Sequence, residues 1–264
     1  MNFDTAIGAA VSSLFIAKII GTVVPQMAIV ALILAVLAIY NFDHLLDAKK
    51  IQAKAISARH RFYQKNFTQL AIYQLVLLTS LLVISWFLPV AIIKSGIILA
   101  VITLIYFLLH FIILPQRFLF KEFMIAAVFT CGLFLGPLSV KSMQFISFEI
   151  ILLWVEIFLL AVANTLIFSW FDYENDRKER HSSLAQIVGA SKILNLCFSV
   201  LIALLFIILF SLANDALWAD QIIILIMGLI LYGSLLLGKH VQQNETLRIA
   251  GEAIFLIPLV RLIF

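Results

Sequence analysis

The sequence predicts an all-α fold, a polytopic membrane bundle of about nine transmembrane helices around a central cavity. Hydrophobic residues make up 64% of its 264 residues, and charged residues make up only 12%. A soluble domain is about 45–50% apolar and about 25% charged, so no soluble fold of this length buries so much apolar surface. The apolar stretches run for about twenty residues instead of alternating over about ten, which favours helices over a β-barrel.

Nine apolar stretches are candidates for membrane spans. No long linker, low-complexity tract or soluble domain separates them, so residues 1–264 are expected to form a single integral membrane domain. The first and last stretches are the weakest candidates, because Lys18 interrupts the first and the short last one contains Glu252 and Arg261. The expected spans are 5–21, 23–42, 67–88, 95–114, 122–140, 150–171, 193–212, 221–238 and 249–264.

Basic residues are divided unequally between the two sides of this predicted bundle. One side holds the N-terminus and the loops near 43–66, 115–121, 172–192 and 239–248. Of the 18 Lys and Arg residues, 14 lie there, and the others are Lys18, Lys94, Lys141 and Arg261. The positive-inside rule therefore predicts that these loops and the N-terminus are cytoplasmic and that the C-terminus is on the opposite side. No basic-aromatic recognition module is visible, so no nucleic-acid partner is expected.

Two pairs of aspartates follow apolar spans on the predicted cytoplasmic side. Asp43 and Asp47 lie four residues apart in "YNFDHLLDAKK", and Asp172 and Asp176 lie four apart in "FDYENDRKER". On a helix this spacing places both carboxylates on one face, about 6 Å apart along the axis. Like charges there repel each other unless a cation lies between them, and Mg²⁺ prefers carboxylates, waters and substrate phosphates as ligands. The two pairs are therefore predicted to face a common cavity, bind Mg²⁺ and, through it, a diphosphate.

Basic residues near both pairs suit a diphosphate as well. Arg binds phosphate oxygens bidentately, and Lys acts as a point charge. The residues expected to bind the diphosphate are Lys121, Lys178, Arg177 and Arg61. The alternative is that these residues are ordinary juxtamembrane charges, because an Asp pair at this spacing also arises by chance.

Parts of the chain resemble the UbiA-type membrane prenyltransferases. The segment Asn164–Gly189, "NTLIFSWFDYENDRKERHSSLAQIVG", resembles their second aspartate-rich motif, a DxxxD followed by basic residues, Thr or Ser, an apolar stretch and Gly. The segment Leu114–Gly132, "LPQRFLFKEFMIAAVFTCG", resembles their third cytoplasmic loop and fifth span. The family's first motif, usually NDxxDxxxD, is incomplete here, because Ile39 and Tyr40 stand where Asn and the first Asp are expected.

The resemblance implies an isoprenyl diphosphate donor, Mg²⁺-assisted loss of diphosphate and capture of the allylic cation by a lipophilic or aromatic acceptor, otherwise unknown, within the lipid bilayer. The catalytic, metal-binding residues would be Asp43, Asp47, Asp172 and Asp176, and the cavity would be lined by Asn164, Asn41 and Tyr40.

Two other functions are open at this point. The incomplete first motif also suits a non-catalytic relative that binds a lipid diphosphate or a partner. A transporter would instead use the polar residues Glu156, Asn164 and Lys18 as an ion path. Its main charges should lie at mid-membrane, whereas the strongest acidic cluster is predicted at one face.

Overall fold

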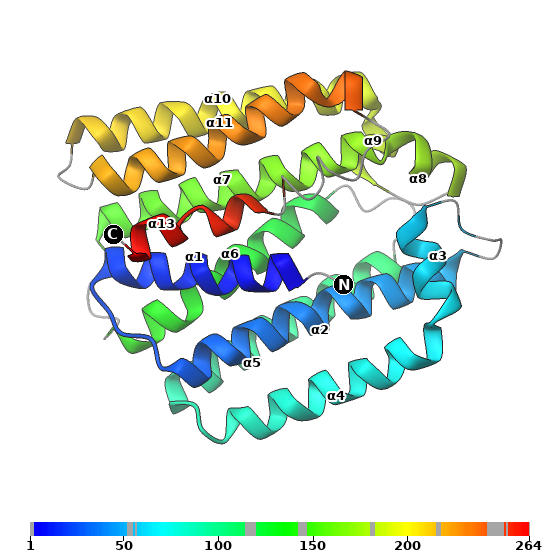
Figure 1. The fold of residues 1–264 in the computed structure, drawn as a ribbon, viewed down its shortest axis with the longest axis horizontal. Coiled ribbons are helices and arrows are strands. Elements are labelled where there is room, and N and C mark those ends of the chain that lie inside the picture. Colours follow the sequence, from blue (N-terminus) through cyan, green and yellow to red (C-terminus); the bar gives the residue numbers. More distant parts are fainter. Residues whose placement is uncertain are drawn as a thin grey trace.

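The computed structural model describes residues 3–51, 55, 57–113, 120–141, 147–179, 183–214, 218–241, 251 and 253–263. Within these residues every regular element is a helix, and the long helices lie side by side in one bundle (Figure 1). The predicted all-α fold is confirmed.

Eight of the described helices are long and apolar enough to cross a membrane, and they coincide with the first eight predicted spans. The protein is therefore an integral, multi-pass membrane protein. A π-helical turn, η1 (Leu109–Ile113), continues the fourth of these helices. The eight are α1 (Phe3–Ile20), α2 (Gln26–Lys50), α4 (Phe67–Ser85), α5 (Val90–Leu108), α6 (Lys121–Val140), α7 (Phe148–Phe171), α10 (Ala190–Asn214) and α11 (Trp218–Val241).

The ninth predicted span, 249–264, differs from the others. Residues 249, 250, 252 and 264 lie outside the described part of the chain, and the rest forms a shorter apolar helical segment, Ile254–Ile263. It consists of a 3₁₀ turn, η2 (Ile254–Leu256), and α13 (Leu259–Ile263). Pro258 lies between them and has no backbone N–H to continue the hydrogen-bond ladder. Ten helical residues extend about 15 Å, half the thickness of the hydrocarbon layer.

This C-terminal segment packs along α1, which presents small residues to it. A Cβ added at Gly8 would lie 2.9 Å from the Phe255 Cβ, so only glycine permits this approach. Ser12 Oγ donates a hydrogen bond to the Phe255 carbonyl (3.1 Å), and Lys18 Nζ donates to the Arg261 carbonyl (2.6 Å). Small residues and hydroxyl groups of this kind let transmembrane helices pack closely.

Three short helices lie together at the end of the bundle where α2 ends and α7 meets α8: α3 (Ala58–Lys65), α8 (Tyr173–Glu179) and α9 (Leu184–Val188) (Figure 1). The N-cap of α3 is Ser57, whose hydroxyl accepts a hydrogen bond from the His60 N–H (3.1 Å). Such N-caps satisfy backbone donors that the first helical turn leaves without partners.

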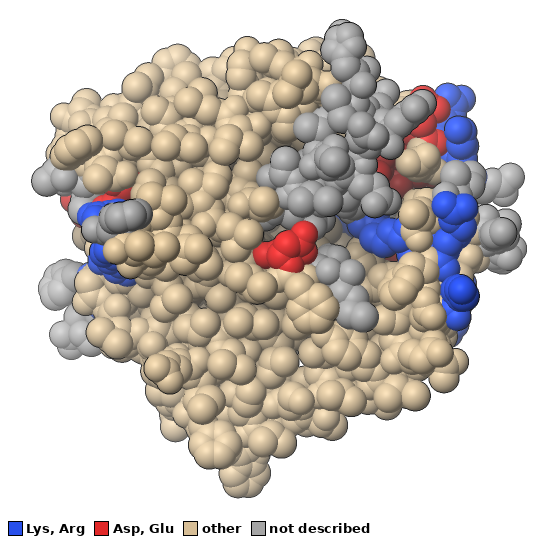
Figure 2. All heavy atoms as spheres, viewed as in Figure 1, with Lys and Arg blue, Asp and Glu red and all other residues tan. Residues whose placement is uncertain are grey.

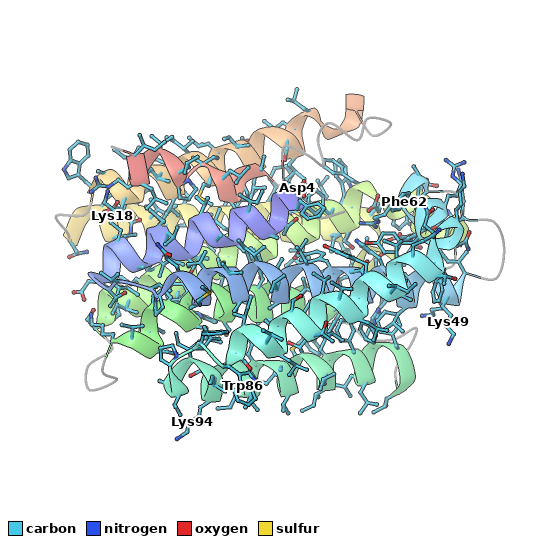
Figure 3. All side chains as sticks on the ribbon, turned by 60° about the horizontal axis from the view of Figure 1, so that its bottom comes forward. Asp4, Lys18, Lys49, Phe62, Trp86 and Lys94 are labelled. Carbon is cyan, nitrogen blue, oxygen red and sulfur yellow. The ribbon has the colours of Figure 1, made fainter. Side chains whose placement is uncertain are left out.

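Charge is concentrated at the two ends of the bundle. Most Lys and Arg side chains visible in Figure 2 lie at opposite ends of its long axis, with a largely uncharged belt between them. Lys18 and Lys94 lie at one end and Lys49 at the other, and Asp4 lies between the two ends (Figure 3). Large apolar side chains are exposed along the belt, including Leu75, which is 63% exposed. This is the surface expected of helices that face lipid.

Candidate functional site

A cavity among α1, α2, α6 and α7 is partly covered by residues of α3 and α8. Segments that are far apart in the sequence meet around it, because its lining includes residues of α2 and residues at the junction of α7 and α8. All four predicted aspartates line this cavity. The polar residues of its lining are Thr5, Tyr40, Asp43, His44, Asp47, Arg59, Lys121, Glu122, Asn164, Thr165, Ser169, Asp172, Asp176 and Ser183.

The first aspartate pair lies on an unbroken helix. Helix α2 continues to Lys50, eight residues past the end predicted for the span, so the helical phase is kept through Asp43 and Asp47. His44, between them, lines the cavity too. One ligand atom from each of these three residues lies within 4.8 Å of the other two. Asp47 and His44 are only 3% and 4% exposed.

The second pair spans the junction between two helices. Asp172 is the C-cap residue of α7 and has helical backbone angles (φ −80°, ψ −1°). The Asp176 N–H donates to the Asp172 carbonyl at 2.8 Å, so the i to i+4 spacing of a helix is preserved into α8. Burial raises the pKa of the Asp176 carboxyl to about 7, and the nearby Asp172 carboxylate contributes to the rise, while Lys121, Ser183 and Arg59 oppose it.

The cations of the cavity are only partly those expected from the sequence. Lys121, at the start of α6, is buried and lines the cavity. Arg59, which is partly exposed, lines it too. In contrast, Arg61, Arg177 and Lys178 are exposed and do not line it. Helical phase explains these positions. Arg61 is about 200° around α3 from Arg59, and Arg177 and Lys178 are about 100° and 200° around α8 from Asp176.

Besides the aspartates, three residues were predicted to line the cavity: Tyr40, Asn41 and Asn164. Tyr40 and Asn164 line it, and Asn164 Oδ1 is buried without a hydrogen-bond partner among the described residues. Asn41 does not line it. Its amide donates to the Leu70 carbonyl (3.1 Å) and to Gln74 Oε1 (2.9 Å), both on α4. Because Asn41 lies about 200° around α2 from Asp43, it faces a neighbouring helix.

Glu122 lines the cavity although the sequence analysis did not select it. Its Oε1 accepts hydrogen bonds from Ser169 Oγ (2.9 Å) and from the Leu184 N–H (2.7 Å), which links α6 to α7 and α9. Its Oε2 is buried without a hydrogen-bond partner among the described residues. A carboxylate in the first turn of an apolar span is itself a signal for a functional site, so the sequence did contain the relevant information.

The lining also has an apolar part, which continues along α6 and α7. Its members are Ile125, Ala126, Phe129, Ala161, Phe168 and Phe255. The rings of Phe129 and Phe255 pack edge to face, with their centroids 4.8 Å apart. The cavity therefore combines carboxylates and cations with an apolar wall, which suits a ligand that has a charged head and a hydrocarbon chain.

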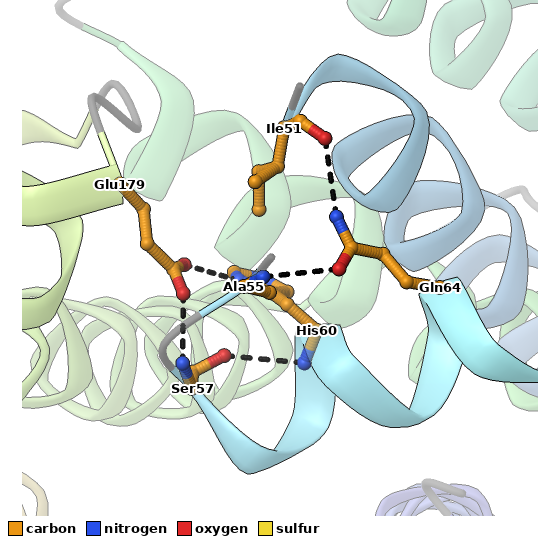
Figure 4. A network of polar contacts seen from close by, with 6 residues as sticks. All are labelled: Ile51, Ala55, Ser57, His60, Gln64 and Glu179. Carbon is orange, nitrogen blue, oxygen red and sulfur yellow. Dashed lines mark hydrogen bonds and ion pairs between the residues drawn. The ribbon is translucent and has the colours of Figure 1, made fainter. Parts of the chain in front are cut away.

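A buried polar network connects α8, which carries Asp176, to α3, which carries Arg59 (Figure 4). Glu179 of α8 accepts a hydrogen bond from the Ser57 N–H at Oε1 (2.7 Å) and contacts His60 Nδ1 of α3 at Oε2 (2.5 Å). The His60 and Glu179 side chains are both 2% exposed. Gln64 of α3 donates a hydrogen bond to the Ile51 carbonyl (3.1 Å) and accepts one from the Ala55 N–H (3.0 Å), which ties α3 to the C-cap residue of α2.

The polar residues that a transporter would use as an ion path lie in three separate places. Glu156, fully buried in α7, accepts hydrogen bonds from Ser211 Oγ of α10 (2.7 Å) and Gln221 Nε2 of α11 (3.1 Å). Lys18 bonds to the C-terminal segment, and Asn164 faces the cavity. The contacts of Glu156 and Lys18 hold helices together.

Two solved structures share this arrangement of helices. One is the apo structure of a UbiA homolog from Aeropyrum pernix K1, with a TM-score of 0.69 and 13% sequence identity, covering 100% of this chain and 98% of that one. The chain has the UbiA fold. The other, from a study of digeranylgeranylglyceryl phosphate synthase in membranes, has a TM-score of 0.60 and 16% identity, covering 97% of this chain and 92% of that one. No protein-family model and no curated protein matches the sequence.

Within this UbiA fold, the residues around the first aspartate pair fit a divalent cation. Asp43 Oδ1 is buried without a hydrogen-bond partner among the described residues. The carboxylate of Asp47 lies nearby on the same helix face. Carboxylate oxygens so close together repel one another when ionised, and a bound cation reverses that interaction. Asp172 and Asp176 line the same cavity and offer a second set of oxygen ligands.

Proposed function

We propose that the protein is a membrane prenyltransferase that transfers an isoprenyl group from an isoprenyl diphosphate to a lipophilic or aromatic acceptor. The observation that carries this proposal is the shared cavity. Two Asp pairs more than a hundred residues apart in the sequence line it together with Lys121, Arg59 and an apolar wall. The UbiA fold supports the same function.

The aspartates would hold Mg²⁺, with Asp43 and Asp47 on one side of the cavity and Asp172 and Asp176 on the other. When bound, Mg²⁺ neutralises charge that develops on the departing diphosphate. Lys121 and Arg59 would bind the diphosphate oxygens directly, and Arg offers two parallel donors for them. Their positive charges are fixed in a partly buried site, where electrostatic stabilisation of a leaving group is stronger than in water.

The apolar wall would hold the hydrocarbon chain of the donor. Phe129, Phe168 and Phe255 line it with aromatic rings, whose faces attract an allylic cation. Excluding water there protects the cation from hydrolysis until the acceptor attacks. In the transfer, the bond between the allylic carbon and the diphosphate oxygen breaks, a bond to the acceptor forms, and the acceptor loses one proton.

The distribution of charge supports a cytoplasmic position for this site. Lys49, two residues after Asp47, lies at the end of the bundle opposite Lys18 and Lys94 (Figure 3). Since 14 of the 18 basic residues belong to the loops assigned to the aspartate side, the positive-inside rule assigns that end to the cytoplasm. The C-terminal segment ends near Lys18, and its end is thus assigned to the opposite side.

The test is transfer of a labelled isoprenyl group. Purified protein, Mg²⁺ and labelled farnesyl or geranylgeranyl diphosphate are mixed with a panel of lipophilic and aromatic acceptors. We expect a prenylated product with the wild-type protein and a loss of at least about a hundredfold in turnover in Asp43→Ala and Asp176→Ala, because each removes a charged ligand from the leaving-group site. Turnover that is unchanged in both variants would contradict the proposal.

A donor that binds without turnover with any acceptor would instead favour a non-catalytic protein that binds a lipid diphosphate. The observation that favours this second function is the incomplete first motif, which has Tyr40 in place of the usual aspartate. Binding and turnover are therefore measured on the same preparation.

A further inference from the structure

We propose that His44 is a direct metal ligand and that the first site therefore selects a divalent transition ion of the first row over Mg²⁺. This inference rests on the proposed function, because it concerns the same cavity, and it assigns a metal class to one half of the site. The group consists of Asp43, His44 and Asp47.

The geometry of the three side chains supports joint binding of one ion. A carboxylate oxygen of Asp43, a ring nitrogen of His44 and a carboxylate oxygen of Asp47 lie within 4.8 Å of one another. Two ligand atoms that are each about 2.0–2.2 Å from one ion lie at most about 4.4 Å apart. Small rotations of the side chains would therefore bring all three atoms to bonding distance of one ion, without movement of α2.

The surroundings of His44 fix the imidazole in the cavity wall. Its side chain is 4% exposed and lines the same cavity as both aspartates. The buried ring of Tyr63 packs against it edge to face, with centroids 5.0 Å apart. The ring of Tyr40 is tilted relative to it, at a centroid distance of 6.4 Å. An imidazole held in this way loses little conformational entropy when it binds a metal.

A second observation points to a cation in this cavity. Glu122, which also lines it, is only 4% exposed, and its Oε2 has no hydrogen-bond partner among the described residues. A buried carboxylate oxygen without a partner is costly unless a ligand satisfies it.

The ligand set decides which metals are preferred. Mg²⁺ is a hard ion that binds oxygen, whereas imidazole nitrogen suits Fe²⁺, Ni²⁺, Cu²⁺ and Zn²⁺, and Mn²⁺ accepts it more readily than Mg²⁺ does. The Asp172–Asp176 side of the cavity offers oxygen ligands from its described residues, so it keeps the preference for Mg²⁺. The helix that lacks the usual first aspartate thus supplies a nitrogen as its third ligand.

The experiment is pulsed electron paramagnetic resonance of bound Mn²⁺ in the full-length protein, without any substrate. The second pair is changed to asparagine (Asp172→Asn with Asp176→Asn), so that Mn²⁺ reports on the first site. We expect ¹⁴N modulation from a directly bound imidazole, which disappears in His44→Gln. The matched control is His60→Gln, a buried histidine whose described partner is Glu179 and which should leave the modulation in place.

Competition between Mn²⁺ and Mg²⁺ gives a second readout. The protein with His44 should bind Mn²⁺ at least about tenfold more tightly than Mg²⁺, and His44→Asp should narrow this ratio by replacing nitrogen with oxygen. His44→Asp also serves if His44→Gln does not fold. Bound Mn²⁺ without ¹⁴N modulation, or modulation that persists in His44→Gln, would overturn the inference and leave the transferase proposal standing. ¹⁴N modulation in the Asp172→Asn, Asp176→Asn variant with His44 intact, together with no prenyl transfer by the wild-type protein, would support the inference and contradict the transferase proposal.

Discussion

Replacing Glu179 with alanine is expected to release the contact between α3 and α8. The Glu179 carboxylate has two partners in α3 and its N-cap, His60 Nδ1 at 2.5 Å and the Ser57 N–H at 2.7 Å. The side chains of His60 and Glu179 are 2% exposed, so water screens the interaction little. Through this contact the segment that carries Arg59 is tied to the one that carries Asp176.

The size of the effect follows from those two bonds. A hydrogen bond to a charged group contributes about 1.5–3 kcal/mol, so losing both costs about 3–6 kcal/mol. Since about 1.4 kcal/mol corresponds to a factor of ten, local opening should become at least about a hundredfold more frequent. Glu179→Gln keeps one acceptor oxygen without the charge and should produce roughly half of the change in free energy.

Hydrogen exchange measured by mass spectrometry tests this directly. Peptides that cover 58–65 and 173–179 should lose protection in Glu179→Ala, whereas peptides from α10 should not change, because only local opening is affected. The control is Glu174→Ala, since Glu174 lies on the same helix and is exposed. Equal exchange in the Glu174 and Glu179 variants would refute the idea that the network joins the two segments.

Two further changes test the cavity and the bundle. Arg59→Ala should raise the KM for the isoprenyl diphosphate by about tenfold or more, and Arg61→Ala should raise it much less, because of these two only Arg59 lines the cavity. Steady-state kinetics measures both variants, and equal effects on the KM would contradict this placement. Gly8→Ala should destabilise the protein by about 1–3 kcal/mol, because its Cβ would lie 2.9 Å from the Phe255 Cβ, whereas Gly96→Ala meets no atom within 4 Å. Thermal unfolding in detergent compares the two variants, and equal melting temperatures would count against the close packing of α1 on the C-terminal segment.

Features that depend on local helical geometry could be predicted from the sequence. The spacing of Asp43 and Asp47 places them on one face of a helix that continues through both, as α2 does. The same geometry puts Asn164 near the face of α7 that carries Asp172, and both residues line the cavity. The same rule excludes Asn41 from the face of Asp43, because two residues correspond to about 200°.

Features that depend on tertiary contacts could not be predicted in this way. Whether Arg59 or Arg61 lines the cavity depends on where α3 begins and on its orientation about its own axis. Ser57 and its contact with Glu179 help to fix both. The partners of Glu156 lie 55 and 65 residues away, on helices whose positions the sequence pattern does not give. The C-terminal segment was expected to cross the membrane fully, although Pro258 interrupts it.

The central claim is that two distant Asp pairs form one metal-dependent diphosphate site. Calorimetric binding of a non-hydrolysable farnesyl thiodiphosphate, with and without Mg²⁺, tests it in the wild-type protein and in Asp43→Asn and Asp176→Asn. We predict that binding requires a divalent ion and that each substitution weakens it by about tenfold or more. Binding of equal strength without divalent ions, or binding that only one of the two substitutions weakens, would contradict the claim.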